Sequence, residues 1–500
     1  MRLFLFAIGG TGARVVRSLT MMLAAGVDGL DSSFEIVPLI IDYDLSNGDK
    51  MRAVKAVEAY SKIHNTLYPD VAKGVKYNDN FFMTGLSPLP SNDPTKPYEF
   101  YFGTLTTEKF ASYLQKNALN TNPSTRLSES LLEALYDTSD DRSMNAELEL
   151  DMAKGFKGNP NIGAVVFHEL KKSPEFQRFA STFNSASDKV FIISSIFGGT
   201  GASGFPELVN AIRTVTNNTL NNANIGAALV LPYFKLKPYD PASGDTGAID
   251  AASFNAKTKA ALGFYATPNG VNSKVDTIYY VADEHKDDYN YAEGEGRQQN
   301  NAHAVEFIAA TAVLDFLLNA PQRGAYEFSI KDDKIKTSVN LPDFYDTTHS
   351  LILNNLSEFS LAMKYYRDVI CGDRNKIGSN VAYYNTFGLS SQIGKGVWKT
   401  IDELLDSTEK NQWGYYSWLK ELNDHDHKVN LYRMDKKKDL TYLLADRQIK
   451  GGFLKTSPLA DSEISSELNK MSKTVTTPSN TLFLKTLRQV SKQIYKSVKL

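Results

Sequence analysis

Uninterrupted apolar runs alternate with helical patterns in the first part of the chain. The stretch Leu3–Ile8 is apolar throughout, and Ala13–Ala25 then places its apolar residues on one helical face. A second apolar run, Phe34–Ile41, comes next. Fully apolar strands separated by helices are typical of parallel sheets that are covered on both faces. The pattern therefore predicts an α/β fold with a Rossmann-like, mostly parallel sheet.

The same alternation continues for about three hundred residues. Further strands are expected from Lys189, over Ile225–Pro232 and over Thr277–Val281. A helix is expected over Ala252–Tyr265. The run Asn300–Asn319 is mostly apolar all round, which is the pattern of a buried helix, so we assign it to the centre of the fold.

The strand–helix alternation is interrupted once within residues 1–320, which we interpret as a nucleotide-binding domain. Residues 49–153 open with a helical pattern and continue into a proline-rich loop, Ser87–Pro97. We interpret this stretch as an insertion. The loop is a candidate docking segment for a protein partner, and a solvated connector is the alternative.

The remainder of the chain has a less regular pattern. Residues 321–480 predict an α+β C-terminal domain, with expected strands at Val381–Leu389 and Val429–Tyr432. Residues 481–500 combine apolar positions at helical spacing with several lysines, which predicts a basic amphipathic helix. Such a helix binds an acidic surface, a membrane or a partner groove, or it packs on its own protein.

Composition narrows the classes of function. The chain has 500 residues, 42% of them hydrophobic, and can bury a large core. The formal net charge of -2 gives no overall electrostatic reason to expect nucleic acid as the partner. The single cysteine, Cys371, excludes an internal disulfide framework and suits the cytoplasm. The first apolar run is too short for a transmembrane segment or a signal peptide, so we expect neither.

Two glycine-rich stretches, Gly9–Gly12 and Gly198–Gly204, follow predicted strands and precede predicted helices. A glycine loop lets several backbone N–H groups point into one concavity at a helix N-terminus, where the helix dipole adds positive potential. Such a loop suits a phosphate group. For a single loop, a tight turn that binds nothing is an equal alternative. Neither stretch continues into Gly-Lys-Ser/Thr, so neither is a Walker A loop.

Acidic residues close the second predicted strand, because Asp42 and Asp44 follow Phe34–Ile41. An acid at this position binds a ribose hydroxyl in dinucleotide-binding folds. The glycines of Gly9–Gly12 do not meet the G-x-G-x-x-G spacing of those folds. A Rossmann-type enzyme that uses NAD or SAM is therefore an alternative, but it leaves Gly198–Gly204 without a role.

The order of these elements resembles the tubulin/FtsZ family of nucleotide-dependent cytoskeletal GTPases, and within it a divergent group of bacterial tubulin-like proteins. The run Phe197–Gly204, FGGTGASG, is similar to the family's signature loop G-G-G-T-G-[ST]-G. Gly158–Gly163, GNPNIG, is similar to its third loop, and Asp276–Asp283, DTIYYVAD, to a strand that carries a base-contacting residue. With Gly9–Gly12 and Ile40–Asp44, five elements match in order.

The resemblance implies a site for GTP or GDP with Mg²⁺. The residues implied to surround the phosphates are Gly9, Gly10, Thr11, Gly12, Gly198, Gly199, Thr200, Gly201 and Ala202. Those implied near the ribose, the terminal phosphate and the ion are Asp42, Asp44 and Asn47, with Asp44 holding Mg²⁺ indirectly. Those implied to form a switch-like loop are Gly158 and Asn159. Those implied to face the base are Asp283, Arg297 and Asn301.

The chain departs from the family in its base-contacting and catalytic positions. Asp283 replaces an asparagine, and a carboxylate accepts from guanine N1–H but cannot donate to O6. Arg297 replaces an aromatic ring, although arginine also stacks on bases. The region Asn319–Phe328 lacks the N-x-D-x-x-D acids that complete the site of the next subunit in the family. Glu327 is the one candidate for an acid that orients the attacking water.

The leading prediction is a GTP-binding, tubulin/FtsZ-like protein that self-associates into oligomers or filaments according to its nucleotide state. GTP hydrolysis is a further expectation and depends on Glu327. A nucleotide-gated switch or scaffold that does not polymerise is the alternative, because the family's acid pattern is missing.

Overall fold

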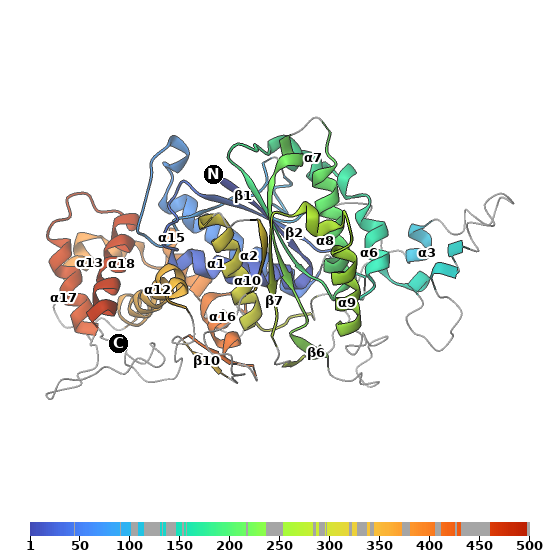
Figure 1. Cartoon of the computed structure of the whole chain (residues 1–500). Coiled ribbons are helices and arrows are strands. Elements are labelled where there is room, and N and C mark those ends of the chain that lie inside the picture. Colours follow the sequence, from blue (N-terminus) through green and yellow to red (C-terminus); the bar gives the residue numbers. More distant parts are fainter. Residues whose placement is uncertain are drawn as a thin grey trace.

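A computed structural model of the chain describes most of its length. It covers residues 1–101, 109–114, 131–136, 147–236, 254–283, 287–289, 296–319, 323–327, 338–340, 345–372, 381–405, 412–425, 428–431 and 461–497, except positions 45, 91, 133, 153–154, 157, 217–218 and 297. One large sheet lies at the centre of the fold, with helices on both sides of it (Figure 1).

The sheet has seven parallel strands in the order β3-β2-β1-β4-β5-β7-β9. The strands are β1 (Arg2–Ile8), β2 (Glu35–Ile41), β3 (Gly85–Leu86), β4 (Lys189–Ser195), β5 (Asn224–Val230), β7 (Thr277–Val281) and β9 (Gly324–Glu327). The α/β class and the parallel sheet predicted from the apolar runs are confirmed. The strands expected after Lys189, at Ile225–Pro232 and at Thr277–Val281 are present within two residues of their expected limits.

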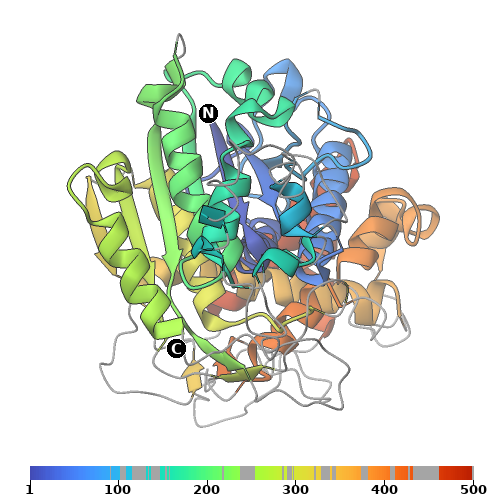
Figure 2. The ribbon, with the colours of Figure 1, turned by 90° about the vertical axis from the view of Figure 1, so that its right-hand side faces the viewer.

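Helices cover both faces of the sheet, which explains why the interiors of the strands are mostly apolar (Figures 1 and 2). Alternate side chains of β1 enter opposite cores: Leu3 and Leu5 lie in one, and Phe4 and Phe6 lie in the other. The helices on the first face are α1 (Gly9–Ala25), α2 (Gly48–Leu67) and α10 (Ala304–Leu318). Those on the second face are α6 (Pro160–Phe167), α7 (Pro174–Thr182), α8 (Gly199–Arg213) and α9 (Phe254–Tyr265).

The first part of the expected insertion belongs to the sheet and its covering layer. Helix α2 packs on α1, and β3 pairs with β2. The bridge between Ile40 and Glu99 continues this edge beyond the proline-rich loop. Residues 48–86, most of which fall in the expected insertion, therefore supply a strand and a helix of the main fold. Further along, the described part of this stretch contains the short helix α3 (Phe110–Tyr113).

The described part of the C-terminal half is mainly helical, and its apolar residues join the core of the first face of the sheet. Its helices are α11 (Asp346–Thr348), α12 (Asn354–Tyr365), α13 (Ala382–Thr386), α14 (Leu389–Gln392), α15 (Gly396–Leu405), α16 (Tyr415–Leu422), α17 (Asp461–Ser472) and α18 (Asn480–Ser497).

Two short parallel pairs of strands lie outside the main sheet in the described part of the chain. In one, β6 (Phe234–Leu236) pairs with β8 (Asp287–Tyr289), and in the other, β10 (Ser338–Asn340) pairs with β11 (Lys428–Asn430).

One expectation for this half is corrected. The strand expected at Val381–Leu389 is wrong, because α13 and the start of α14 occupy these residues. Their aromatic side chains pack as a helical face, with Tyr383 stacked on Phe483. Beyond the expected domain boundary at residue 320, β9 joins the main sheet. The strand expected at Val429–Tyr432 overlaps β11.

The C-terminal helix α18 packs on its own protein. Its apolar residues Phe483, Leu487 and Val490 are buried against the rest of the chain. Arg488 is also buried, and it donates to the backbone oxygen of Asn80 at 2.6 Å. Within the described residues, no helix is both long and apolar enough to cross a membrane.

Candidate functional site

The carboxyl ends of β1 and β4 lie side by side at the centre of the sheet. From β1 the chain passes through α1 on one face to β2, and from β4 it passes through α8 on the other face to β5. This reversal is a topological switch point, where open α/β sheets bind ligands. A Cβ atom on Gly9 would lie 3.6 Å from Cβ of Thr200. Two helix N-termini therefore lie beside each other at this edge.

Both helices begin within the glycine stretches, so the prediction of separate loops before them is wrong. A Cβ atom on Gly12 would lie 2.7 Å from the backbone carbon of Ala7, and one on Gly201 would lie 2.2 Å from the oxygen of Ser195. These two glycines are needed because each helix packs directly on the strand before it. The N–H groups left for a ligand are those of the first turn of each helix.

The segment before α6 approaches the first turn of α8. A Cβ atom on Gly199 would lie 3.0 Å from the nitrogen of Asn159 and 3.1 Å from that of Gly158. The Asn159 N–H donates to the oxygen of Phe156 at 2.8 Å, and Lys257 Nζ donates to the oxygen of Gly158 at 2.9 Å. Residues 160–163 of the third predicted loop already belong to α6, so the irregular part of this loop is shorter than expected. The third predicted loop is thus a short turn in contact with the signature stretch.

Two buried carboxyl groups follow β2. Asp42 accepts from the N–H of Asp44 at 3.1 Å, and Asp44 accepts from the N–H of Ser46 at 3.0 Å. Burial raises the pKa of Asp42 to about 7, the charge of Lys50 opposes this shift, and the neighbouring Asp44 adds to it. Lys50 itself pairs with Glu99 at 2.9 Å. A cation or a hydroxyl donor placed beside this acid pair would favour its ionised form.

The acid pair fits an indirectly held Mg²⁺ better than a metal held by protein alone. Within the described ranges, no group of three or more His, Cys, Asp or Glu side chains is arranged to hold a metal ion. Mg²⁺ commonly takes one or two carboxylates and completes its shell with water and substrate oxygens. Asp44 and Asp42 meet the carboxylate part of that requirement.

Asn47 is the N-cap of α2. Its side-chain oxygen accepts from two N–H groups of the first turn, at 2.9 and 3.0 Å, and its Nδ2 donates to Gln298 Oε1 at 3.0 Å. The same Nδ2 lies 3.8 Å from the Cβ position of Gly10. A Cβ atom on Gly48 would lie 2.5 Å from Gln299 Cγ and 2.9 Å from the oxygen of Gln298, so these two residues pack directly on this turn. Asn47 thus connects the α1 turn with the segment that leads to α10.

A buried arginine, which the sequence pattern does not single out, lies behind the first turn of α1. Arg14 forms ion pairs with Asp49 and Glu306 and donates to the hydroxyl of Tyr233. That hydroxyl donates in turn to Glu306 at 2.6 Å. Asp49 and Glu306 have no exposed side-chain area. The turn that carries the predicted phosphate-binding N–H groups is therefore fixed from behind by charged side chains.

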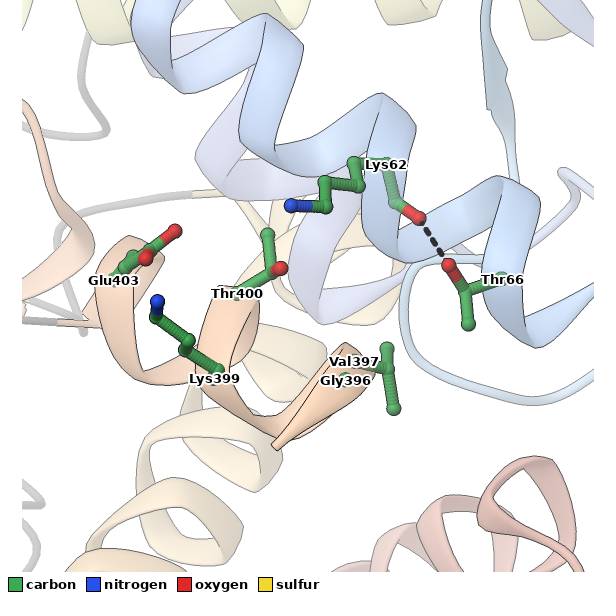
Figure 3. Close-up of a pocket in the computed structure, with 7 residues that line it drawn as sticks. All are labelled: Lys62, Thr66, Gly396, Val397, Lys399, Thr400 and Glu403. Atoms are coloured by element: carbon green, nitrogen blue, oxygen red, sulfur yellow. Dashed lines mark hydrogen bonds between the residues drawn. The ribbon is translucent and has the colours of Figure 1, made fainter. Parts of the chain in front are cut away.

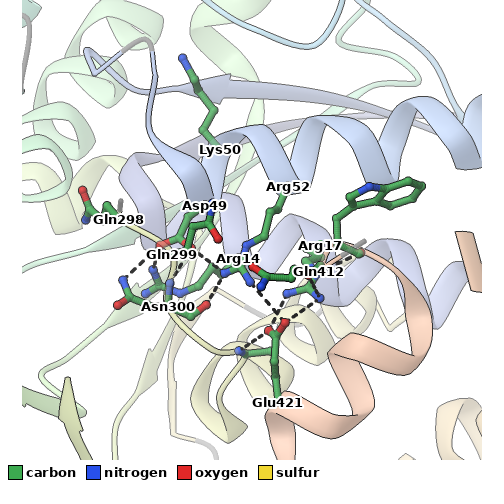
Figure 4. Close-up of polar contacts among 12 residues, drawn as sticks. Arg14, Arg17, Asp49, Lys50, Arg52, Gln298, Gln299, Asn300, Gln412 and Glu421 are labelled. Carbon is green, nitrogen blue, oxygen red and sulfur yellow. Dashed lines mark hydrogen bonds and ion pairs between the residues drawn. The ribbon is translucent and has the colours of Figure 1, made fainter. Parts of the chain in front are cut away.

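The same ion-pair network reaches the C-terminal half (Figure 4). Asp49 accepts from Arg52 at 2.7 Å, and Arg52 pairs with Glu421 of α16 at 3.2 Å. Arg17 pairs with Glu421 at 2.6 Å. Three arginines thus face three carboxylates, which keeps the buried charge balanced. Arginines within the otherwise apolar and small residues of α1 are the sequence signal for this network, but they do not identify its partners.

The residues predicted to contact the base, and the predicted catalytic acid, lie farther from the N-termini of α1 and α8. Asp283 follows β7, two strands from β4, and Asn301 lies just before α10. Arg297 lies outside the described residues. Glu327 ends β9, three strands from β4, which corresponds to about 14 Å at the usual strand spacing. The structure therefore does not bring the backbone of Glu327 to the helix N-termini of its own chain.

A surface pocket of about 260 Å³ lies between α2 and α15, away from these residues (Figure 3). It is lined by Lys62, Thr66, Gly396, Val397, Lys399, Thr400 and Glu403. Its lysines and Glu403 are exposed. Lys62 is separated from the N-terminus of α2 by about 20 Å along the helix axis, so the pocket is distinct from the switch point.

The geometry at the switch point suits an extended anionic ligand. Two helix N-termini favour negative charge, and the acid pair beside them suits an ion that bridges to it. No protein-family model matches the chain, and no curated protein matches it either. Its function must therefore be argued from this site.

Proposed function

We propose that the chain binds a guanine nucleotide at the switch point, with the phosphates at the N-termini of α1 and α8. The observation that carries this proposal is the 3.6 Å approach between the Cβ position of Gly9 and Cβ of Thr200. It brings two sets of free helical N–H groups to one place, which a single glycine turn does not achieve.

Neighbouring residues support phosphate binding in distinct ways. The first-turn N–H groups of both helices and the hydroxyl of Thr200 donate to phosphate oxygens. Lys257 supplies a positive charge beside Gly158, which lies next to the α8 turn. Asp44 holds Mg²⁺ through water, and Asp42 accepts from a ribose hydroxyl. Asp283 and Asn301 contact the guanine.

The order of the strands and turns also supports a tubulin/FtsZ-like protein that self-associates according to its nucleotide state. In this proposal, Glu327 acts on the nucleotide of a second copy, since its strand lies at the far edge of the sheet in its own chain. The reducing cytoplasm is the proposed location, and Cys371, which forms no disulfide within the described residues, is compatible with it.

The position of Glu327 equally favours a second candidate, a nucleotide-gated switch that neither hydrolyses GTP nor polymerises. Sedimentation of the purified protein with GTP and with GDP separates the two. Nucleotide-dependent pelleting supports assembly, and binding without pelleting supports the switch.

A substitution at Thr200 tests nucleotide binding without harming the fold. Thr200→Asp places a carboxylate in the first turn of α8, where the helix dipole favours it, so the thermal stability of the nucleotide-free protein should be kept or raised. The same charge repels phosphate, and the affinity for GDP should fall by about tenfold or more. The measurement is calorimetric titration, preceded by identification of any nucleotide released on denaturation.

Asn210→Asp is the matched control. It adds the same charge to the same helix about 15 Å from Thr200, and Lys274 already donates to the Asn210 side chain at 2.6 Å. The GDP affinity of this variant should equal that of the unchanged protein. Nucleotide binding at this site is refuted if the unchanged protein binds no guanine nucleotide, or if Thr200→Asp binds it equally well.

A further inference from the structure

Segment 300–302, which runs into α10, is held by buried charged and polar groups on both sides of Asn301. Asp49 accepts from the backbone N–H of Asn300 at 2.9 Å and from its side-chain amide at 3.1 Å. Arg52 donates to the backbone oxygen of Asn300. The backbone and the side chain of Asn300 are therefore fixed by α2.

Ala302 is fixed by residues from the C-terminal half. Glu421 of α16 accepts from the Ala302 N–H at 2.9 Å, and His425 Nε2 contacts the Ala302 oxygen at 2.8 Å. A nitrogen that faces a carbonyl must carry the proton, so this contact assigns Nε2–H to His425. Ala302 is almost completely buried, and these two contacts replace the water that its backbone groups lose.

Glu421 is itself held in one orientation. Arg17 donates to both of its carboxylate oxygens, at 2.6 and 3.1 Å, and Arg52 donates to one of them at 3.2 Å. A carboxylate that forms a bidentate hydrogen-bonded pair with a guanidinium has little rotational freedom. Figure 4 shows Glu421 below Arg17 and Arg52, with Asp49 and Asn300 to the left of Glu421.

We propose that Glu421 is a positioning residue for base recognition. It fixes Ala302 while Asp49 fixes Asn300, so that the backbone direction at Asn301 is set from both sides. Because Asn301 is the proposed base contact, Glu421 sets the preference for guanine over other bases without touching the nucleotide. This inference rests on the proposed function, and it assigns part of the selectivity to a residue 119 positions beyond the segment it holds.

Glu421→Gln tests the inference, since it keeps the shape and an acceptor but removes the charge that holds Arg17 and Arg52. The probes are GDP, ADP and pyrophosphate, measured by calorimetry. The preference for GDP over ADP should fall by about tenfold, the factor that corresponds to one misplaced hydrogen bond. Pyrophosphate affinity should stay unchanged, because the helix N-termini are not altered. Glu463→Gln, an exposed position on α17, is the matched control and should change neither.

Arg17→Lys is the milder second variant if Glu421→Gln does not fold. It keeps the positive charge but replaces the fork with a single donor point, and it should shift the GDP-to-ADP preference in the same direction. Amide hydrogen exchange of residues 298–305 without nucleotide should be faster in both variants.

The inference is overturned if exchange in this segment is unchanged, or if GDP, ADP and pyrophosphate affinities all fall together. A protein that shows the faster exchange but binds no nucleotide refutes the proposed function and the selectivity role, while leaving the fixation of Ala302 by Glu421 established.

Discussion

The docking of α18 on α12 should weaken as the pH rises, because of one buried carboxyl group. Glu358 of α12 is 2% exposed, and its Oε2 lies 3.9 Å from Arg488 Nε. Among the described residues, this oxygen has no hydrogen-bond partner. Burial raises the pKa of Glu358 to about 7, Arg488 and Lys492 oppose the shift, and Asp28 and Asp79 add to it.

The sign and size of the effect follow from proton linkage. The ordinary pKa of this side chain is 4.5, and the folded value is about 7, so the folded state binds the proton more tightly. Stability from this group is complete below pH 4.5 and is lost as the pH rises toward 7. The shift corresponds to at most about 3 kcal/mol. Glu358→Gln stays neutral and should not lose this contribution.

The assay is hydrogen exchange of α12 and α18 amides between pH 5 and pH 8, corrected for the intrinsic exchange rate, since local opening reports the stability of this contact. The free energy of opening should fall with pH in the unchanged protein and less steeply in Glu358→Gln. Glu463→Gln removes an exposed carboxylate and should behave like the unchanged protein. Equal pH dependence in all three proteins would refute the reasoning. Weaker protection of Glu358→Gln at pH 8 would show instead that the ionised carboxylate stabilises the contact through Arg488.

Two further predictions concern the glycines at the start of α1 and Lys257, which donates to the oxygen of Gly158. Gly12→Ala should lower the free energy of unfolding by about 1–3 kcal/mol, because the added Cβ would lie 2.7 Å from the backbone of Ala7. At Gly10 the nearest atom to an added Cβ is 3.5 Å away, so Gly10→Ala should fold normally. Thermal unfolding compares the two variants, and equal melting temperatures would contradict the packing role of Gly12. Lys257→Met should lower GTP affinity by about tenfold through loss of one charge near the phosphates. Exposed Lys259→Met on the same helix is its control, and equal affinities of the two variants for GTP would exclude Lys257 as a phosphate contact.

The strands of the main sheet could be predicted because their signal is local. Each of Leu3–Ile8, Phe34–Ile41 and Thr277–Val281 is a short and mostly apolar run that needs burial on both faces, whatever the rest of the chain does. The helix starts could not be predicted in the same way. At Gly12 and Gly201, the missing Cβ allows a helix to pack on its strand, and the same residue type also suits an open loop.

The strand expected at Val381–Leu389 was predicted wrongly for a related reason. The run Val381–Leu389 is rich in tyrosine and other residues common in strands, but Tyr383 in α13 and Phe387 in the turn after it pack against Phe483 of α18. Propensity is a weak preference that tertiary packing overrides.

The sequence by itself determined the parallel α/β fold and the two glycine stretches at Gly9 and Gly198, because both are encoded in neighbouring residues. Only the tertiary structure decided that the two stretches meet, and that Arg17 of α1 and Glu421 of α16 pair across 404 positions. The physical reason is that a buried charge needs a partner but accepts one from any part of the chain. Its identity is fixed only when the helices pack.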